Sequence, residues 1–360
     1  MVSSSLPDLD SGVMTDDQRV DLLQGLVAIP STSRHEAEAV SYLCDWMNRL
    51  GFKAAPDAAG SAVGRIGSGP RTIVLLGHID TVPGNIPVRI ENGVLHGRGA
   101  VDAKGPLATF VCAAAEAAAR ANATIFVVGA VGEESIGSAG ATEIAKWPAP
   151  EYCVIGEPSG WDAVCLGYRG TISTIYRLTQ GSRHFAGPGE SVAEQAVTFW
   201  NGLNAEAARL NEGVTGSFQS IGATLRSMGT TSDGLSDEAW MSIGVRVPPG
   251  LDVDAFLATM YELARSAELT IEGKQHGYRT DKKSLIVPPF LRSIRGEGGT
   301  PRFTLKLGTS DMTVVGPVWN CPIVAYGPGD ASLDHTPEER IVLDDYLKAV
   351  RVLTEVLVAL

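Results

Sequence analysis

The sequence has no run of about 18 or more apolar residues, the length that a helix needs to cross a bilayer. It also has no long run of lysine and arginine, and its formal net charge is −12. These absences argue against a membrane protein, and against nucleic acid or an anionic membrane surface as the main partner. The first fourteen residues lack the basic and apolar regions of a signal peptide, so we expect a disordered tail there.

Cysteine is scarce and follows no pattern. The five cysteines show no Cys-x-x-Cys spacing and mostly fall within apolar runs. This usage predicts reduced thiols in the core of a cytoplasmic protein. The alternative, a catalytic thiol, lacks a neighbouring base in the sequence.

The chain of 360 residues is long for a single core, so we expect two domains. Strands alternate with helices over residues 1–166 and again over 284–360, which predicts an α/β domain with a mixed, mostly parallel sheet flanked by helices. Residues 167–283 instead follow the order strand, helix, strand, strand, helix, strand. That order is ferredoxin-like and predicts a small α+β domain inserted into the larger one.

Local signals mark several helix starts. A Ser or Thr followed three residues later by Glu or Gln predicts a capping box, and a proline favours the first turn of a helix. The expected capping boxes are Thr15 with Gln18, Ser33 with Glu36, and Thr336 with Glu339, and the expected first-turn prolines are Pro106 and Pro337.

An apolar run from Thr72 to Leu76 reads as a buried strand that delivers His78 and Asp80 at its end. Residues two apart on an extended chain point the same way, so the imidazole and the carboxylate can lie side by side. Asp102 follows in a glycine-rich turn before an alanine-rich helix. Such a His-x-Asp pair is more often an ordinary hydrogen-bonded pair than a metal site, but the second carboxylate strengthens the case for a metal.

Four further polar positions stand after predicted strands or before a predicted helix, namely Glu133, Glu134, Glu157 and His335. Each alone has an ordinary explanation as a surface, turn or helix-entrance residue. Open α/β sheets, however, bind ligands beyond the carboxyl ends of their strands. Together with His78 and Asp102, these positions offer two imidazoles, four carboxylates and no thiolate. This set suits two divalent ions that share one carboxylate.

These motifs resemble those of the M20 family of metallopeptidases and amidohydrolases. The matching stretches, in the family's order, are residues 77–83, 97–105, 132–135, 156–158 and 334–336. The resemblance implies a dinuclear metal hydrolase in which one metal takes His78 and Glu157, the other takes Glu134 and His335, and Asp102 bridges them. It also implies that Asp80 orients His78, that Glu133 is the general base, and that the peptide after Asp102 is cis.

The same resemblance suggests residues that contact the substrate. His184 matches the family's oxyanion donor, which reaches across a dimer, although a single loop histidine is otherwise a surface residue. Arg246 resembles an arginine that holds a substrate carboxylate, with a strand-face charge as the equal alternative. Ser310 and Asp311 would line the pocket, where Asp311 could meet a substrate ammonium.

Within the family, residues 97–107 and 307–312 are most similar to hydrolases that release lysine or ornithine from an amino-group carrier protein in lysine and arginine biosynthesis. This implies a homodimer formed through the inserted domain and a small acidic carrier protein as substrate. A basic patch of Arg65, Arg71, Arg89 and Arg98 could receive the carrier. The alternatives are an N-acetylornithine deacetylase or succinyl-diaminopimelate desuccinylase, a dipeptidase or carboxypeptidase, or a binding protein without turnover. Nitrogen and oxygen ligands favour zinc first, and also admit cobalt or manganese.

Overall fold

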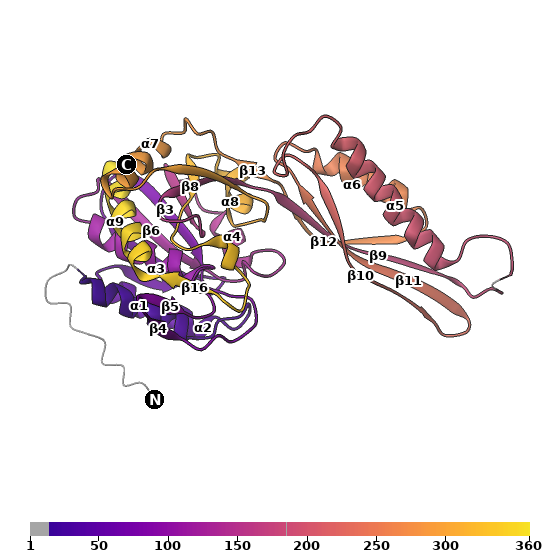
Figure 1. The fold of residues 1–360 in the computed structure, drawn as a ribbon, viewed down its shortest axis with the longest axis horizontal. Helices are drawn as coiled ribbons and strands as arrows, with labels where there is room; N and C mark the ends of the chain where they lie inside the picture. Colours follow the sequence, from indigo (N-terminus) through magenta and orange to yellow (C-terminus); the bar gives the residue numbers. More distant parts are fainter. Residues whose placement is uncertain (1–13, 185) are drawn as a thin grey trace. The chain divides into compact units, whose positions relative to one another are not determined.

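The structure is a computed structural model that describes residues 14–184 and 186–360. The chain divides into two compact units (Figure 1). The larger unit runs to Gly167 and resumes over Thr280–Thr304 and Ser310–Leu360. The smaller unit consists of Tyr168–Arg279 and Leu305–Thr309.

The predicted disordered tail falls mostly on residues 1–13, which lie outside the described residues. Its last member, Met14, is described and is buried in the core of the larger unit. The prediction is wrong at this residue because Met14 directly precedes Thr15, the N-cap of the first helix, and an apolar side chain so close to that helix packs with it.

A mixed sheet forms the centre of the larger unit. Its strands lie in the order β1 (Lys53–Pro56), β2 (Ala62–Gly67), β6 (Ala123–Ala130), β3 (Arg71–His78), β7 (Tyr152–Gly156), β15 (Ile323–Ala325) and β8 (Ala163–Tyr168). Strands β6, β3, β7 and β15 are parallel to one another, and β1, β2 and β8 pair antiparallel on either side of them. The predicted α/β class is confirmed, with the parallel pairing at the centre of the sheet.

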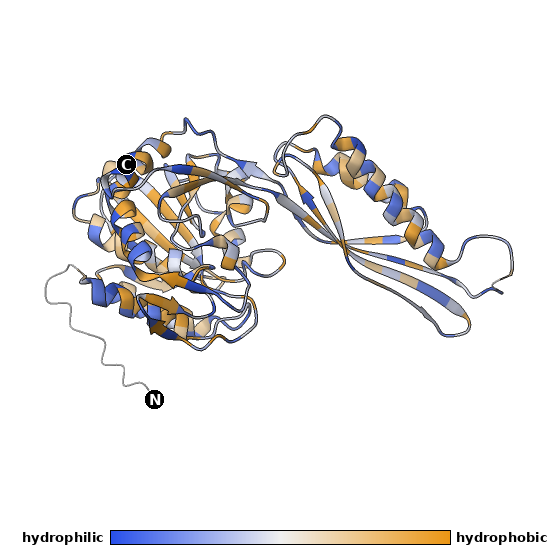
Figure 2. Cartoon of the chain, viewed as in Figure 1, coloured by the Kyte–Doolittle hydropathy of each residue, from blue (hydrophilic) through white to orange (hydrophobic). Residues whose placement is uncertain are grey.

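Helices cover this sheet, and its strands carry the apolar residues (Figure 2). The helices of the larger unit are α1 (Asp16–Ala28), α2 (Ala37–Arg49), α3 (Lys104–Ala117), α4 (Ala139–Ile144), α7 (Val287–Gly296), α8 (Met312–Trp319) and α9 (Leu343–Ala359), with a 3-10 turn η1 (Ala331–Leu333). Helix α3 packs against β3 on one side and α9 on the other, which explains why nearly all of its residues are buried. A small antiparallel sheet of β4 (Arg89–Glu91), β5 (Val94–His96) and β16 (Arg340–Val342) completes the unit. No helix in the described part of the chain is long and apolar enough to span a membrane.

The smaller unit is a four-stranded sheet with two helices. Its elements are β9 (Gly170–Gly181), α5 (Val192–Leu210), β10 (Gly222–Ser232), β11 (Ser236–Val247), α6 (Val253–Ala264) and β12 (Glu268–Gln275). The strands lie in the order β10-β11-β9-β12 and pair antiparallel throughout, which is the predicted ferredoxin-like arrangement. In its core, Tyr176 of β9 stacks on Phe199 of α5 at 4.7 Å between ring centroids. Two short strands, β13 (Tyr278–Arg279) and β14 (Arg302–Lys306), lie near the borders of the units along the chain.

The predicted helix starts are only partly correct. The capping box of Thr15 with Gln18 is confirmed at the start of α1. The box of Ser33 with Glu36 is wrong: α2 begins at Ala37 without a side-chain cap, because the Ser33 hydroxyl donates to Asp80 instead.

The expected helix start at residues 336–339 is also wrong. The Thr336 hydroxyl donates to the Leu333 carbonyl, Glu339 binds another loop, and α9 begins only at Leu343. Pro106 lies inside the first turn of α3, which begins two residues earlier at Lys104.

The cysteines are largely where the sequence predicts them. All five are free, four of them are buried, and Cys321 is partly exposed. The prediction of core thiols is therefore confirmed for four of the five.

Candidate metal centre

The candidate site lies at the carboxyl ends of three neighbouring parallel strands, β3, β6 and β7. His78 is the last residue of β3, and Glu157 directly follows β7. Glu133 and Glu134 follow β6 in a turn at Gly132, whose φ of 74° favours glycine. Parallel strands end at one edge of the sheet, which brings these side chains together although they are far apart in the sequence.

Two loops bring the remaining members of the cluster. Asp102 lies between β5 and α3, and the peptide between Asp102 and Ala103 is cis, as the sequence resemblance implied. His335 follows the 3-10 turn η1 and has a φ of 60°.

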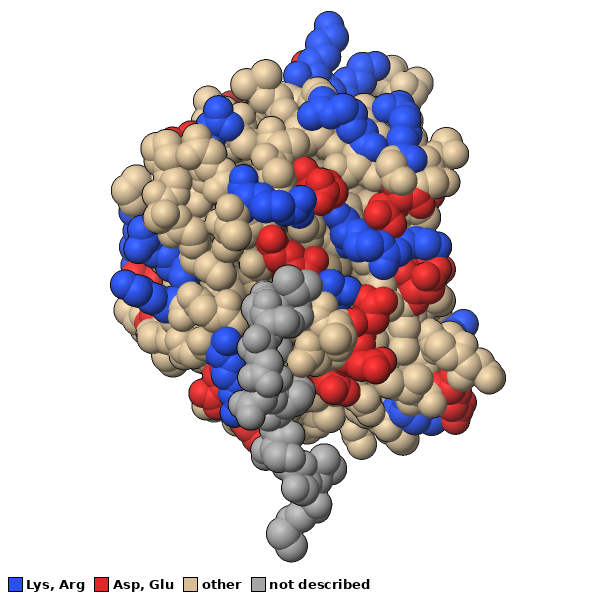
Figure 3. All heavy atoms as spheres, turned by 90° about the vertical axis from the view of Figure 1, so that its left-hand side faces the viewer, with Lys and Arg blue, Asp and Glu red and all other residues tan. Residues whose placement is uncertain are grey.

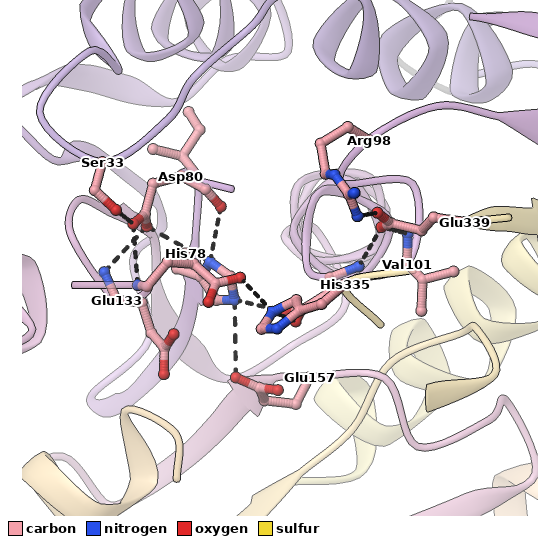
Figure 4. Close-up of polar contacts among 12 residues, drawn as sticks. Ser33, His78, Asp80, Arg98, Val101, Glu133, Glu157, His335 and Glu339 are labelled. Carbon is pink, nitrogen blue, oxygen red and sulfur yellow. Dashed lines mark hydrogen bonds and ion pairs between the residues drawn. The ribbon is translucent and has the colours of Figure 1, made fainter. Parts of the chain in front are cut away.

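The side chains lie within ion-pair distance of one another (Figure 4). His78 Nε2 lies 3.0 Å from Asp102 Oδ1 and 3.9 Å from Glu157 Oε1. His335 Nε2 lies 3.0 Å from the other oxygen, Asp102 Oδ2, and 2.9 Å from Glu134 Oε1. Asp102 thus has one carboxylate oxygen toward each imidazole, which is the geometry of a bridging ligand.

Three overlapping groups of donor atoms, each lying within 4.8 Å, result from this arrangement. The groups are His78 with Asp102 and Glu157, Asp102 with Glu134 and His335, and His78 with Glu133 and Glu134. We call the six residues the His-carboxylate cluster.

The electrostatics of the cluster fit a cation. Burial, together with the anions of Asp102 and Glu133, raises the pKa of Glu157 well above its usual range. Burial likewise raises the pKa of Glu133, with Asp311 and Glu134 adding to the effect and His78 opposing it. Four carboxylates and two imidazoles lie close together here, and their oxygen and nitrogen donors suit divalent ions.

The pKa values of the two imidazoles are raised as well, but by hydrogen bonds to carboxylates. Hydrogen bonds to Asp102 and Glu134 raise the pKa of His335 to about 10. Burial opposes the charged form of His78, but hydrogen bonds to Asp102 and Asp80 outweigh it and raise the pKa of His78 well above its usual range. A metal ion bound to these nitrogens would compete with the protons that the raised pKa values favour.

Asp80 supports the cluster through hydrogen bonds to neighbouring segments. Its buried carboxylate accepts hydrogen bonds from the Ser33 hydroxyl at 2.7 Å and from the backbone N–H groups of Glu133 and Glu134 at 3.1 and 3.0 Å. His78 Nδ1 lies 3.1 Å from the backbone carbonyl of Asp80 and 3.6 Å from its carboxylate. The carboxylate therefore holds the turn of Glu133 and Glu134 as well as lying beside His78.

The residues predicted to bind substrate are distributed between the two units. His184 and Arg246 belong to the smaller unit, where His184 is exposed and accepts a hydrogen bond from the Ala186 N–H. Arg246 donates to the Thr309 hydroxyl at 3.3 Å. Ser310 and Asp311 belong to the larger unit and are buried there.

Asp311 has an unusual environment. It is 2% exposed, and neither of its carboxylate oxygens has a hydrogen-bond partner among the described residues. Burial raises its pKa to about 7, the His78 charge opposes this rise, and the Asp80 anion adds to it.

Three of the four arginines of the expected basic patch take part in ion pairs or hydrogen bonds. Arg98 pairs with Glu339 and is mostly buried, Arg71 bonds the carbonyl of the C-terminal residue, and Arg89 pairs with Glu91. On the face shown in Figure 3, lysine and arginine side chains are interleaved with aspartates and glutamates over much of the surface. Arg98 is therefore held in a buried ion pair, whereas Arg71 and Arg89 remain exposed.

Sequence reasoning missed the supporting roles of Ser33 and Glu339. Both residues fit a capping-box pattern, so the local signal pointed to helix starts instead. Their actual partners lie 47 residues away or more in the sequence, where no short motif connects them.

The fold and the cluster together define a two-unit α/β protein with a candidate dinuclear metal site, and comparison with known proteins assigns the family. Residues 74–359 match the model of peptidase family M20/M25/M40. The chain belongs to this family and is a hydrolase.

Individual relatives are similar over almost the whole chain. A [LysW]-lysine hydrolase of Deinococcus radiodurans is 44% identical over 348 residues, covering 94% of this chain and 96% of that protein. A putative [LysW]-lysine/[LysW]-ornithine hydrolase of Thermococcus kodakarensis is 38% identical, covering 96% of this chain and 93% of that protein. The fold matches the M20 family metallo-carboxypeptidase Sso-CP2 of Sulfolobus solfataricus with a TM-score of 0.76 at 19% identity, over 94% of this chain and 98% of that one.

Proposed function

We propose that this protein is a metal-dependent amidohydrolase that releases lysine, or ornithine, from its amide linkage to an amino-group carrier protein in amino-acid biosynthesis. The observation that carries this proposal is the 44% identity, over 94% of the chain, with a protein named for hydrolysis of [LysW]-lysine. The His-carboxylate cluster supports it, because all six side chains lie together at one edge of the sheet.

We propose that two divalent ions bind to the cluster, zinc first and cobalt as the alternative. His78 and Glu157 would hold one ion, Glu134 and His335 would hold the other, and Asp102 would contact both, in keeping with the two donor groups that share Asp102. When bound, such ions supply a water of lowered pKa and polarise the amide carbonyl.

Glu133 is the general base in this proposal. It lies outside the two donor groups that share Asp102, yet within 4.8 Å of His78 and Glu134. Its carboxylate takes a proton from the attacking water and returns it to the leaving amine of lysine. The raised pKa of Glu133 suits this task, because a base works best when its pKa lies near the pH at which it operates.

Charged groups of the substrate need partners as well. We propose that Arg246 binds the substrate carboxylate through its guanidinium fork, and that His184 of a second copy donates to the developing oxyanion. Asp311, with Ser310 beside it, would receive an ammonium group, since a buried carboxylate without a hydrogen-bond partner gains most from a positive charge.

We further propose a cytoplasmic homodimer formed through the smaller unit. Strand β10 supports this proposal, because it lies at the edge of the small sheet and leaves one row of backbone groups for another chain.

The test is hydrolysis by the purified protein after loading with zinc or cobalt. Carrier-linked lysine, carrier-linked ornithine, N-acetylornithine and N-succinyl-diaminopimelate are offered in parallel, and the free amino acid is measured. We expect metal-dependent release from the carrier-linked substrates, with much slower release from the small ones. Preference for a small substrate would assign a deacylase instead, and two bound metals without any release would point to a binding role.

A further inference from the structure

Glu339 is a buried carboxylate that lies outside the His-carboxylate cluster. It is 1% exposed. One oxygen, Oε1, accepts hydrogen bonds from the backbone N–H groups of Val101 and Asp102 at 3.0 and 3.1 Å. The other, Oε2, accepts a hydrogen bond from Arg98 Nη1 at 2.6 Å (Figure 4). These contacts satisfy a carboxylate that would otherwise be costly to bury.

The backbone around Glu339 binds the same segment. Its carbonyl accepts the Gly97 N–H at 3.3 Å. Strands β16 and β5 pair directly beside it, with Arg340 opposite His96. Main chain and side chain thus tie the residues after His335 to the loop that carries Asp102, although the two segments are more than 230 residues apart in the sequence.

The hydrogen bonds and strand pairing at Glu339 connect the two loops that carry Asp102 and His335. Asp102 contributes to both donor groups of the proposed metal centre, and His335 belongs to one of them. Because Glu339 holds the Asp102 backbone directly and follows His335 by four residues, movement at Glu339 would displace ligands of both groups.

Arg98 makes this arrangement compatible with an acidic site. The cluster already contains four carboxylates, and another unpaired anion next to them would add repulsion. The Arg98 guanidinium neutralises Glu339, and its Nε donates to the Gly84 carbonyl at 3.3 Å. Glu339 can therefore accept the two N–H groups without adding net charge.

We propose that Glu339, held by Arg98, is a positioning residue that fixes the Asp102 loop, so that the affinity for both metal ions depends on it. The proposal rests on the proposed metal centre and does not depend on the identity of the substrate. Groups that orient metal ligands typically contribute tenfold to 100-fold in metal affinity.

The test compares Glu339→Gln with Glu116→Gln. In the first variant, the glutamine would keep one oxygen for the two N–H groups, but its amide NH₂ would face Arg98 as donor against donor. Glu116 is a suitable control because it also pairs with an arginine, Arg19, at 2.7 Å in a similarly enclosed setting of the larger unit and belongs to no donor group. Zinc affinity is measured on the full-length protein by competition with a chromophoric chelator, well below the unfolding temperature.

We expect Glu339→Gln to weaken zinc binding at both sites by about tenfold to 100-fold, and Glu116→Gln to leave it within about twofold. Equal loss of thermal stability in both variants, with unchanged zinc affinity in Glu339→Gln, would show a merely structural ion pair and overturn the proposal. Should Glu339→Gln fail to fold, Arg98→Lys provides the second variant. It retains the charge, loses the guanidinium fork and should weaken zinc binding in the same direction.

The wild-type protein separates this proposal from the proposed function. Zinc binding without release of lysine would refute the substrate and leave the positioning role standing if Glu339→Gln still weakens binding. A wild-type protein that binds no zinc would refute the metal centre and the positioning role together.

Discussion

Glu133→Gln is the substitution that most directly examines the chemistry of the site. The change preserves the shape of the side chain and removes its ability to accept a proton. Loss of a general base typically lowers the rate by about 10²–10⁴-fold, which corresponds to about 2.7–5.4 kcal/mol in the activation barrier. Metal content should be unchanged, because Glu133 is absent from both donor groups that share Asp102.

Although Glu133→Gln should lower the activity, it should increase the stability of the metal-free protein at higher pH. Burial, with Asp311 and Glu134 nearby, raises the pKa of Glu133 above its ordinary value of 4.5. The contribution of protonated Glu133 to the free energy of unfolding is therefore fully present below about pH 4.5, and it is lost as the pH rises through the raised pKa. Glutamine stays neutral, so the variant should match the wild type at low pH and become the more stable protein at higher pH.

Two assays check these expectations. Steady-state kinetics on the zinc-loaded proteins give kcat, and denaturant unfolding with a chelator at about pH 5 and about pH 8 gives the free energy of unfolding. Glu134→Gln serves as the control, because it removes a proposed ligand and should lower zinc content as well as activity. Turnover of Glu133→Gln within a few-fold of the wild type, or activity lost only because zinc is lost, would refute the assignment of the base.

Three further predictions concern metal binding and its support. Removing the metals should lower the thermal midpoint in a scanning assay, since each site at 100 times its Kd stabilises the folded protein by about 2.7 kcal/mol; an unchanged midpoint would contradict metal binding. Zinc binding at about pH 7.5 should release protons, and the His335→Gln variant should release about one proton fewer, because the pKa of His335 is about 10 without a metal. Calorimetry in buffers of different ionisation enthalpy counts the released protons. Equal release from both proteins would show that His335 is not a ligand. Asp80→Asn should lower the free energy of unfolding in urea by about 1–3 kcal/mol, because one of the Glu133 and Glu134 N–H groups would face an amide NH₂. A stability equal to that of the wild type would mean that the turn does not depend on this carboxylate.

The elements with long, regular patterns could be predicted from the sequence. The apolar run before His78 forms β3, and the alternation of strands and helices gives the parallel centre of the sheet. The order of elements in the smaller unit is also correct, because each is long enough to show its own periodicity. The positions of His78, Glu133 and Glu157 follow from the same reasoning, since His78 ends a buried strand and the two glutamates come shortly after buried strands.

Short elements could not be predicted in this way. Strands β4, β5 and β16 have three residues each and show no useful alternation. They exist because they pair with one another, with Arg340 opposite His96 and Arg89 opposite His96 on the two sides of β5. Such pairing depends on chain segments that only the folded structure brings together.

The two failed capping boxes have a common physical cause. A capping hydroxyl typically contributes about 1 kcal/mol to a helix, whereas a hydrogen bond to a charged group contributes about 1.5–3 kcal/mol. The Ser33 hydroxyl therefore stabilises the protein more by donating to the buried Asp80 carboxylate than by capping α2. For Glu339 the difference is larger, because its carboxylate receives two backbone N–H groups and Arg98. In both cases a helix-capping hydrogen bond is replaced by a tertiary hydrogen bond near the His-carboxylate cluster, as expected where tertiary contacts assemble a functional site.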